Sequence, residues 1–467
     1  QQFSFKNIDT FSTGSLVTRL TNDIQQVQNL IMMGLRMMLR APGMFLGALV
    51  MAFWMNAELA AVILVVIPLL TAAIVWILRT AYPRFTAMQK ALDTLNSGIQ
   101  EVLTNVRVNR ELKEAGLRAL KIVIATMPVM MFAMNVTTLA VVWFGGNLII
   151  GGRMAVGDLT AFTTYIVQIL MSLMMLSMVF LQSSRAMASI RRIDEVLDEP
   201  IDLSDENASQ KDRKVEKGRV EFKDVSFSYR EGGEPVLSHI SLTAEPGETI
   251  GILGATGSGK TSLVQLIPRL YDATEGSVRV DGIDVREYSL KNLRDGVGMV
   301  LQKNVLFSGT IEENLRWGDE TATEEEVRRA AVYAQADSFV NSFAEGYKTE
   351  MGQGGVNVSG GQKQRLCIAR ALLKKPKILI LDDSTSAVDT ATEAAIRTAF
   401  REDLKDTTKF IIAQRLSSLE YADRILVLED GRIIGEGTQE KLLASCEAYR
   451  EIYETQYGKR ADGEVMA

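Results

Sequence analysis

Residues 249–270 read TIGILGATGSGKTSLVQLIPRL, and this stretch decides the fold of the second half of the chain. An apolar run precedes a glycine-rich loop of the form GxxxxGKT, and an amphipathic run follows it, which is the order strand, loop, helix. Backbone N–H groups of such a loop and the helix N-terminus bind phosphate oxygens, whereas a plain glycine turn is the alternative interpretation. The lysine reaches the β- and γ-phosphates and the threonine ligates Mg²⁺. The expected nucleotide ligands are Gly254, Thr256, Gly257, Ser258, Gly259, Lys260, Thr261 and Ser262.

Two later stretches extend this prediction. Residues 358–365 read VSGGQKQR, and residues 378–383 read ILILDD, an apolar strand that ends in an acid suited to organising Mg²⁺, Asp382. The glycine loop, the SGGQ segment and this strand together resemble the ATPase domain of an ABC transporter. The resemblance implies ATP and Mg²⁺ as cofactors and a composite site, in which the SGGQ segment clamps a phosphate on the opposite subunit. The clamp residues would be Ser359, Gly360, Gly361 and Gln362.

The same resemblance carries roles to other positions. It implies that Tyr229 stacks on adenine, that Gln302 touches Mg²⁺ together with Thr261 and Asp382, and that Lys260 belongs to the catalytic set. A purely structural strand tyrosine is the alternative for Tyr229. The segment STSAVD at 384–389 matches the family's dimer-interface loop, with Ser386 and Asp389 as its expected contact residues.

Two positions depart from the family pattern. Asp383 stands where glutamate usually orients the attacking water, so its carboxylate is one methylene short, and a displacement of about 1 Å can cost about a hundredfold in rate. Gln414 stands where histidine is usual, and an amide cannot carry positive charge. Both changes predict that this chain's own catalytic residues bind ATP and hydrolyse it slowly. Because the SGGQ segment is intact, we expect a non-identical partner that carries the consensus glutamate and histidine.

The first half of the chain predicts a membrane domain. A membrane-spanning helix needs roughly 20 apolar residues. Four expected spans, the last four of an exporter's usual six, cover residues 31–55, 59–78, 122–150 and 159–183. Lysine and arginine concentrate between the second and third spans and after the fourth, which places those segments in the cytosol. We therefore expect an integral membrane protein, in a bacterial plasma membrane, with a cytosolic nucleotide domain.

The residues before the first span resemble the cytosolic link between the second and third helices of ABC exporters. Phe11, the STG-x-L segment at 12–16 and the RLxxD segment at 19–23 carry this likeness. The first two helices are thus expected upstream of Gln1. Similar proteins have a longer stretch near Val108, which leaves the second coupling helix in doubt. The fold class is multi-domain: an all-α transmembrane domain at 1–198, a linker at 199–217 and an α/β P-loop NTPase domain at 218–467.

Bulk properties exclude several classes of function. The 467 residues have a net charge of −6 and no basic stripe, so nucleic acid is not an expected partner. One histidine cannot form a metal cluster, and two cysteines, Cys367 and Cys446, predict reduced thiols. A soluble ABC-type ATPase conflicts with the four apolar runs.

The substrate is not readable from these motifs. The spans carry few charges, and methionines at 171, 174, 175 and 178 fall on one helical face. They favour a pocket for hydrophobic small molecules such as drugs, because methionine adapts to varied ligands, although packing between helices explains them equally well. A lipid or peptide exporter, or a non-pumping nucleotide-gated or regulatory ABC membrane protein, remains the alternative.

Overall fold

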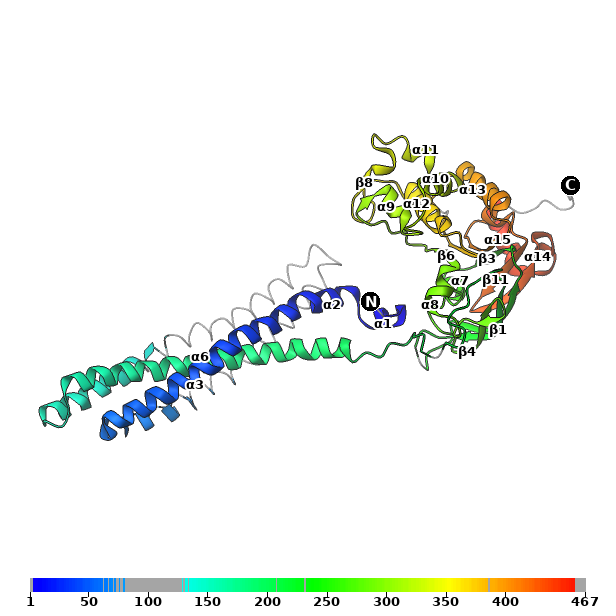
Figure 1. The fold of residues 1–467 in the computed structure, drawn as a ribbon. Coiled ribbons are helices and arrows are strands. Elements are labelled where there is room, and N and C mark those ends of the chain that lie inside the picture. Colours follow the sequence, from blue (N-terminus) through cyan, green and yellow to red (C-terminus); the bar gives the residue numbers. More distant parts are fainter. Residues whose placement is uncertain are drawn as a thin grey trace. The chain divides into compact units, whose positions relative to one another are not determined.

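The computed structural model describes residues 3–457 except 62, 66, 70, 73–74, 76–78, 80–127, 129–130, 133, 207, 231 and 385–386. The chain divides into two compact units, one of residues 11–199 and one of residues 1–10 with 200–467 (Figure 1). The segment near Val108 lies outside the described residues, and so does most of the span expected at 122–150 before residue 134.

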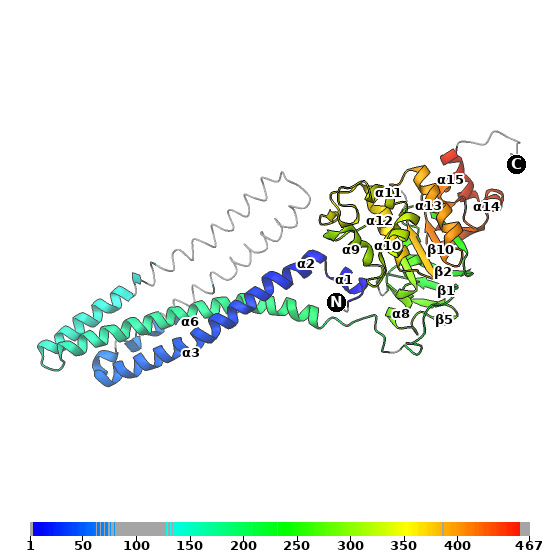
Figure 2. The same ribbon diagram turned by 45° about the horizontal axis from the view of Figure 1, so that its top comes forward.

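The first unit is helical. One long helical stretch, Thr13–Met55, consists of α2 (Thr13–Thr18), the π-helical turn η1 (Arg19–Asp23) and α3 (Ile24–Met55). The unit also contains the long helix α6 (Val156–Leu197) and a helix over Met134–Ile150. Figure 2 shows α3 and α6 side by side, as Figure 1 does. Within the described residues, two helical stretches are long and apolar enough to cross a membrane, Thr13–Met55 and Val156–Leu176.

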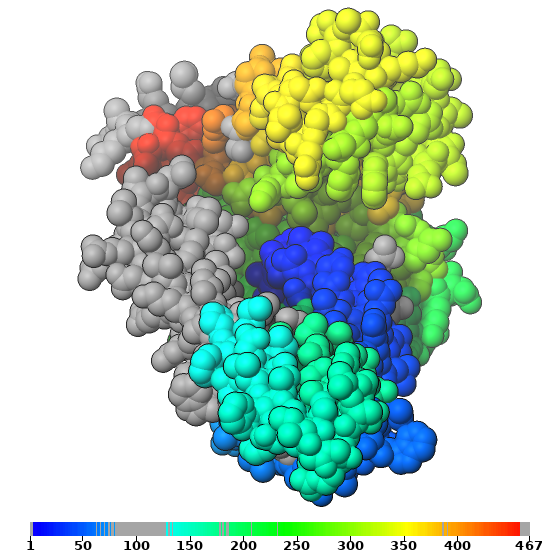
Figure 3. Space-filling model, turned by 90° about the vertical axis from the view of Figure 1, so that its left-hand side faces the viewer, coloured from blue at the N-terminus to red at the C-terminus, as the bar shows by residue number. Residues whose placement is uncertain are grey.

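The surface of this unit suits a lipid environment. Alanine, β-branched residues, leucines and Phe162 pack where the helices meet, whereas many other large apolar side chains point outward. Leu39, Trp54 and Trp143 are 78%, 83% and 73% exposed. Of the methionine face, Met174 packs against the core and Met171 is 45% exposed. Figure 3 shows the helix over 134–150 (cyan) beside the start of α6 (blue-green), above the end of α3 (blue).

A polar cluster joins η1 to the far end of α6. Asp23 is 2% exposed and accepts hydrogen bonds from Ser189 Oγ (2.9 Å) and Arg192 Nε (2.8 Å). Arg19 of η1 also pairs with Glu195 of α6, at 3.0 Å. The two bonds between Asp23 and Arg192 therefore fasten η1 to α6.

The second unit contains a six-stranded sheet in the order β12-β11-β3-β10-β9-β6. All neighbouring strands are parallel except β11 and β12, which form a hairpin with its turn at Asp430-Gly431, a residue pair that favours such turns. The strands are β3 (Thr249–Gly254), β6 (Val297–Val300), β9 (Ile378–Asp382), β10 (Thr408–Ile412), β11 (Arg424–Glu429) and β12 (Arg432–Gly437). A second, antiparallel sheet has the order β2-β1-β4-β5, from β1 (Val220–Phe227), β2 (Leu237–Ala244), β4 (Glu275–Val280) and β5 (Ile283–Asp284).

Helices and one short strand pair complete this unit. Their bounds are α7 (Lys260–Gln265), α8 (Leu290–Asp295), β7 (Gly309–Thr310), α9 (Ile311–Arg316), α10 (Glu324–Tyr333), α11 (Asp337–Val340), η2 (Gly346–Lys348), β8 (Glu350–Met351), α12 (Gly360–Leu373), α13 (Thr390–Asp403), η3 (Leu416–Leu419), α14 (Gln439–Ser445) and α15 (Glu447–Tyr457). A capping box of Thr323 and Glu326 starts α10. Both cysteines are free thiols, as predicted, and both are buried.

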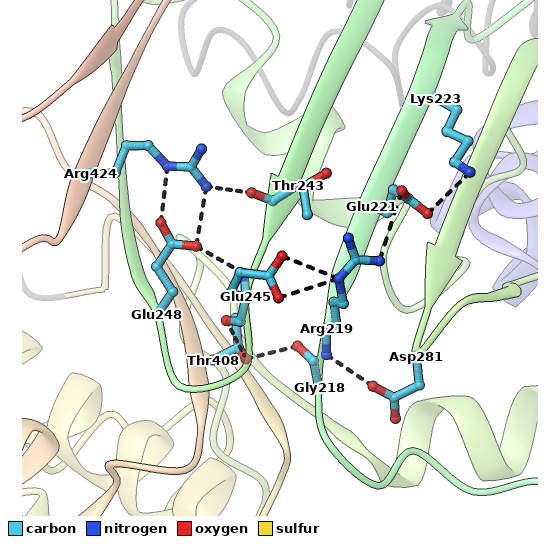
Figure 4. Close-up of polar contacts among 10 residues, drawn as sticks. All are labelled: Gly218, Arg219, Glu221, Lys223, Thr243, Glu245, Glu248, Asp281, Thr408 and Arg424. Carbon is cyan, nitrogen blue, oxygen red and sulfur yellow. Dashed lines mark hydrogen bonds and ion pairs between the residues drawn. The ribbon is translucent and has the colours of Figure 1, made fainter.

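Polar contacts join the two sheets at one end (Figure 4). Thr408 Oγ1 donates to Gly218 O at 2.7 Å and accepts from Gly247 N at 3.1 Å. Arg424 pairs with Glu248 at 3.0 Å, and Arg219 N donates to Asp281 at 2.9 Å. The Thr408 bond ties Gly218, just before β1, to β10, and Arg424 of β11 also donates to Thr243 O of β2, so the antiparallel sheet is held against the parallel one.

The first residues of the chain pack on this second unit. Helix α1 (Phe5–Thr10) is fastened by Asn7 Nδ2, which donates to Pro200 O at 3.0 Å, and by Asp9, which accepts from Tyr271 Oη at 2.9 Å. The rings of Phe5 and Tyr271 lie 6.3 Å apart. This short helix therefore contacts the residues next to Tyr229.

Candidate nucleotide site

The glycine loop connects the centre of the parallel sheet to α7. Strand β3 lies between β10 and β11, so the loop after Gly254 follows the carboxyl end of an inner strand. Gly257 and Gly259 have φ of +87° and +92°, a left-handed backbone that turns successive N–H groups towards one point. A Cβ on Gly259 would lie 2.9 Å from Val236 O. The loop thus requires glycine there for both conformation and space.

A cavity of about 330 Å³ lies beside this loop and brings most of the expected residues together. Gly254 and Ser258 do not line it; Ser258 is 5% exposed beneath the loop. The lining residues are Tyr229, Val236, Thr256, Gly257, Gly259, Lys260, Thr261, Ser262, Gln302, Asp382, Asp383, Ile412 and Gln414.

Lysine and magnesium-type ligands sit at the floor of the cavity. Lys260 Nζ donates to Gly254 O at 2.8 Å and to Ala255 O at 2.6 Å. Burial lowers the pKa of Lys260, and the nearby carboxylates of Asp382 and Asp383 oppose that effect. Thr261 Oγ1 donates to Asp382 Oδ2 at 2.9 Å, so the hydroxyl and the carboxylate are close enough to share one cation. Burial raises the pKa of Asp382.

Two amides surround the second acid. Gln414 Nε2 donates to Asp383 Oδ2 at 2.9 Å, and Gln302 also hydrogen bonds to Asp383. Burial raises the pKa of Asp383, while the hydrogen bond from Gln302 and the charge of Lys260 act in the opposite direction. Asp383 has φ of +48°, a conformation that aspartate tolerates better than most side chains. The positions of both family departures are thus in direct contact.

An aromatic cluster sets the position of Tyr229. Its hydroxyl lies 2.8 Å from Ser262 Oγ on α7, and its ring meets Phe227 and Tyr271 edge-on, with centroids at 4.8 and 5.2 Å. Tyr229 is 40% exposed, so part of its ring is free to meet a planar ligand. Burial raises the pKa of Tyr271, and the hydrogen bond to Asp9 adds to this effect.

The SGGQ segment lies outside this cavity. None of its residues lines the cavity, and Ser359 and Gly360 are exposed. Ser359 begins α12: its Oγ accepts from Gln362 N at 3.3 Å, and Gln362 Oε1 accepts from Ser359 N at 2.9 Å. A Cβ on Gly361 would lie 2.7 Å from Ala387 O, so that glycine allows close approach of the neighbouring loop. Asp389 begins α13 by accepting from Thr392 N at 2.9 Å, and Ser386 lies outside the described residues.

The sequence reasoning missed four residues of this region. Val236 and Ile412 line the cavity; only their place next to strand ends could have indicated this. Gln456 of α15 donates to Gln414 O at 2.7 Å and accepts from Leu416 N at 2.9 Å. Gln364 accepts from Ala387 N at 3.0 Å. The last two position backbone segments, and no motif signals such contacts.

The residues present fit ATP with Mg²⁺. The cavity offers a phosphate cradle of glycine N–H groups, a lysine, a hydroxyl–carboxylate pair for the cation and a half-exposed aromatic ring for a base. The lysine's present acceptors are loop carbonyls, weaker partners than a phosphate, so a nucleotide can displace them.

Comparison with known families agrees with this geometry. The model described as "ABC transporter" matches residues 237–386, and the model described as "ABC transporter transmembrane region" matches residues 1–108 and 108–173. The second match therefore covers most of the helical unit, up to residue 173, and the first covers the loop, the SGGQ segment and the two acids.

Individual proteins are similar over nearly the whole chain. An uncharacterized ABC transporter ATP-binding protein of Bacillus subtilis, YfiB, is 42% identical over 98% of this chain and 82% of its own length. A fatty acid ABC transporter ATP-binding/permease protein of Mycobacterium bovis is 36% identical over 94% of this chain and 72% of its own. Among solved structures, that of a bacterial Atm1-family ABC exporter with ATP bound has a TM-score of 0.80 at 27% identity, covering 99% of this chain and 83% of that one.

Proposed function

The chain belongs to the ABC transporter family, with a membrane region fused to an ATP-binding domain, and on this premise we propose that it is the weakly hydrolytic subunit of a heterodimeric exporter. It is an ATP-hydrolysing, membrane-spanning transporter that uses ATP with Mg²⁺ and keeps its nucleotide domain in the cytosol. The predicted fold class, an all-α membrane domain with an α/β nucleotide domain, is confirmed. We place it in a bacterial plasma membrane.

The contact between Asp383 and Gln414 carries the proposal. In the family pattern, glutamate orients water at the first position and histidine acts at the second. Here a shorter acid accepts a hydrogen bond from a neutral amide at 2.9 Å. That oxygen is occupied by a donor, and the carboxylate is further from the site of attack by about one C–C bond. Hydrolysis at this site is therefore slow, because a base must reach its proton within hydrogen-bond distance.

The remaining residues keep their roles in binding. Tyr229 stacks on adenine, Lys260 moves from loop carbonyls to phosphate oxygens, and Thr261, Asp382 and Gln302 hold Mg²⁺. Bound there, Mg²⁺ neutralises charge on the phosphates. This site thus holds ATP firmly and turns it over rarely.

The exposed face at Ser359 completes the partner's site. Its hydroxyl and the N–H groups that begin α12 form an anion-binding helix end directed out of the chain. Because the face is intact, a partner with the consensus glutamate and histidine hydrolyses ATP quickly against it. Ser386 and Asp389 belong to the loop that crosses the same interface. Hydrolysis at that one site resets the transporter.

We propose hydrophobic small molecules, including drugs, as the exported substrate. The described spans expose many apolar side chains and few charged ones, and the methionine face includes the half-exposed Met171. The similar Mycobacterium bovis protein is named a fatty acid transporter, which supports a lipid as the second candidate. A peptide exporter and a non-pumping regulatory subunit are alternatives that the same assays address.

The test is ATP turnover by the chain alone and with its co-purified partner. Slow turnover alone and fast turnover in the complex are expected. Brisk hydrolysis by identical copies would overturn the heterodimer. In liposomes, the complex should export a lipophilic dye or a fatty acid with substrate-stimulated turnover; absence of transport, with intact hydrolysis, would favour the regulatory alternative.

A further inference from the structure

A second cavity lies at the opposite end of the parallel strands from the nucleotide cavity. It has a volume of about 230 Å³ and is bounded by α13, η3 and the first residues of β3 and β10. The strands β3 and β10 are parallel, and the glycine loop follows the last residue of β3. The second cavity therefore meets the strands where they begin, and the nucleotide cavity meets them where they end.

The charge of this cavity is strongly positive. Four cationic side chains line it, those of Arg397, Arg401, Lys405 and Lys409, against one carboxylate, Asp423. That carboxylate already accepts a hydrogen bond from Thr249 N at 2.7 Å. Glu402, which does not line the cavity, lies 3.8 Å from Arg401. The four cations still outnumber the two carboxylates near them, and this excess of positive charge favours an anionic ligand.

Lys409 is the most unusual of the four cations. It is 3% exposed, and its Nζ donates to Thr407 O at 2.8 Å. Among the described residues no acidic group forms an ion pair with it. A buried ammonium group has three protons to donate and is costly to leave partly unpaired. Burial lowers the pKa of Lys409, with Asp423 acting in the opposite direction.

Arg397 supplies a second uncommitted donor. One of its terminal nitrogens donates to Ser417 O, and its guanidinium lies 5.4 Å from the centre of the Tyr421 ring. Its Nε is buried and has no hydrogen-bond partner among the described residues. Orphaned buried donors are rare in folded proteins and often mark a missing ligand.

We propose that this cavity binds a phosphoryl anion, such as inorganic phosphate or the phosphate of a small metabolite, through Lys409 and Arg397, with Arg401 and Lys405 at its mouth. Phosphate has oxygens enough to accept from both buried donors and fits the volume. Inorganic phosphate is also a product of the reaction that this transporter carries out.

The position of the cavity gives the anion a regulatory role. Helix α13 begins at Asp389, in the loop predicted to cross the dimer interface, and η3 follows two residues after Gln414. An anion bound between α13 and η3 cross-links the elements that carry these two functional segments. Binding therefore restrains both the interface loop and the switch residue at once.

The test uses thermal unfolding of the full chain in detergent, with inorganic phosphate against sodium chloride of equal ionic strength. The Lys260→Ala variant serves as the background, because it weakens phosphate binding at the glycine loop. Phosphate is expected to raise the melting temperature in this background with an apparent Kd in the low millimolar range. Binding only to the native state stabilises it in proportion to RT ln(1 + [phosphate]/Kd), so a titration yields the affinity.

Lys409→Met should weaken phosphate binding at least tenfold, and the exposed change Arg401→Gln should weaken it several-fold even if the first variant folds poorly. Lys374→Met is the matched control, since that lysine is also partly buried with a lowered pKa but lies elsewhere. Its phosphate response should be unchanged. An unaltered response in Arg401→Gln, loss of the response in Lys260→Ala, or an equal effect of chloride would overturn the proposal. Parallel titrations with glucose 6-phosphate distinguish a metabolite from free phosphate by their relative affinities.

Discussion

The nucleotide cavity and the face at Ser359 both bind phosphate in this family, yet the fold treats them differently. In the cavity, polar groups are satisfied within the chain: Thr261 binds Asp382 and Gln414 binds Asp383. At the second face, Ser359 and Gly360 are exposed, and Ser359 bonds within its own helix. One half-site is thus an open cavity formed within the chain, and the other is an exposed surface that, in our proposal, acts together with a second chain. Substitutions in the two regions should affect two different ATP molecules.

The largest expected effect comes from the exposed face. Ser359→Ala removes both a helix cap and a phosphate donor, so turnover of the complex should fall about a hundredfold, the usual cost of one transition-state donor. Thr323→Ala is a matched control, since Thr323 begins α10 with the same capping box. Both variants should lose about 1 kcal/mol of stability.

ATPase rates and urea unfolding of each variant check this prediction. If the two alanine variants lowered turnover equally, the face at Ser359 would act only through helix stability. ATP affinity at the chain's own cavity, measured with the partner's site inactivated, should stay unchanged in both.

The next largest effect is an increase in the rate of hydrolysis, and it comes from the nucleotide cavity. Asp383→Glu combined with Gln414→His should raise hydrolysis at the chain's own site about tenfold, because the base regains its reach and loses the competing amide. Each single change should lower the activation free energy by less than half as much as the double change, since the two side chains are in contact. Single-turnover assays on the chain alone measure this. Additive effects would contradict direct coupling.

The residual activity of the unmodified pocket should depend on pH. Burial raises the pKa of Asp383. On acidification this carboxylate therefore takes up its proton at a pH above the ordinary aspartate pKa of about 3.9. Hydrolysis by the chain alone should therefore decline on acidification earlier than that value implies. A pH–rate profile tests this, and Asp383→Asn should remove the acidic limb. An acidic limb that persists in Asp383→Asn would assign it to another group.

The sequence predicted these two regions unequally well. The spacing of the glycines, the threonine and the acid follows from phosphate and Mg²⁺ chemistry, so Thr261 and Asp382 were predicted as a pair before their contact was known. Gln456 was not, because its contact with the backbone of Gln414 joins residues separated by 42 positions and depends on where α15 packs. The pattern of residues 321–343 predicts a helical segment, and the chain forms two helices there, α10 and α11, separated by a turn at Gln335, whose φ is +55°.

The smallest expected effect lies at the adenine end of the pocket. Tyr271→Phe keeps the ring beside Tyr229 but removes the hydrogen bond to Asp9, whose net contribution is about 1 kcal/mol. Loosening of this edge-on contact should weaken ATP binding about threefold, a change in binding free energy on the order of half the contribution of that hydrogen bond. Tyr288→Phe is the matched control, because that buried tyrosine loses one bond, to Val280 O, away from the cavity. It should lose stability and keep its ATP affinity. Equal ATP affinities for both variants would mean that Tyr271 stabilises the fold and leaves the pocket unaffected, whereas a selective loss assigns it to positioning Tyr229.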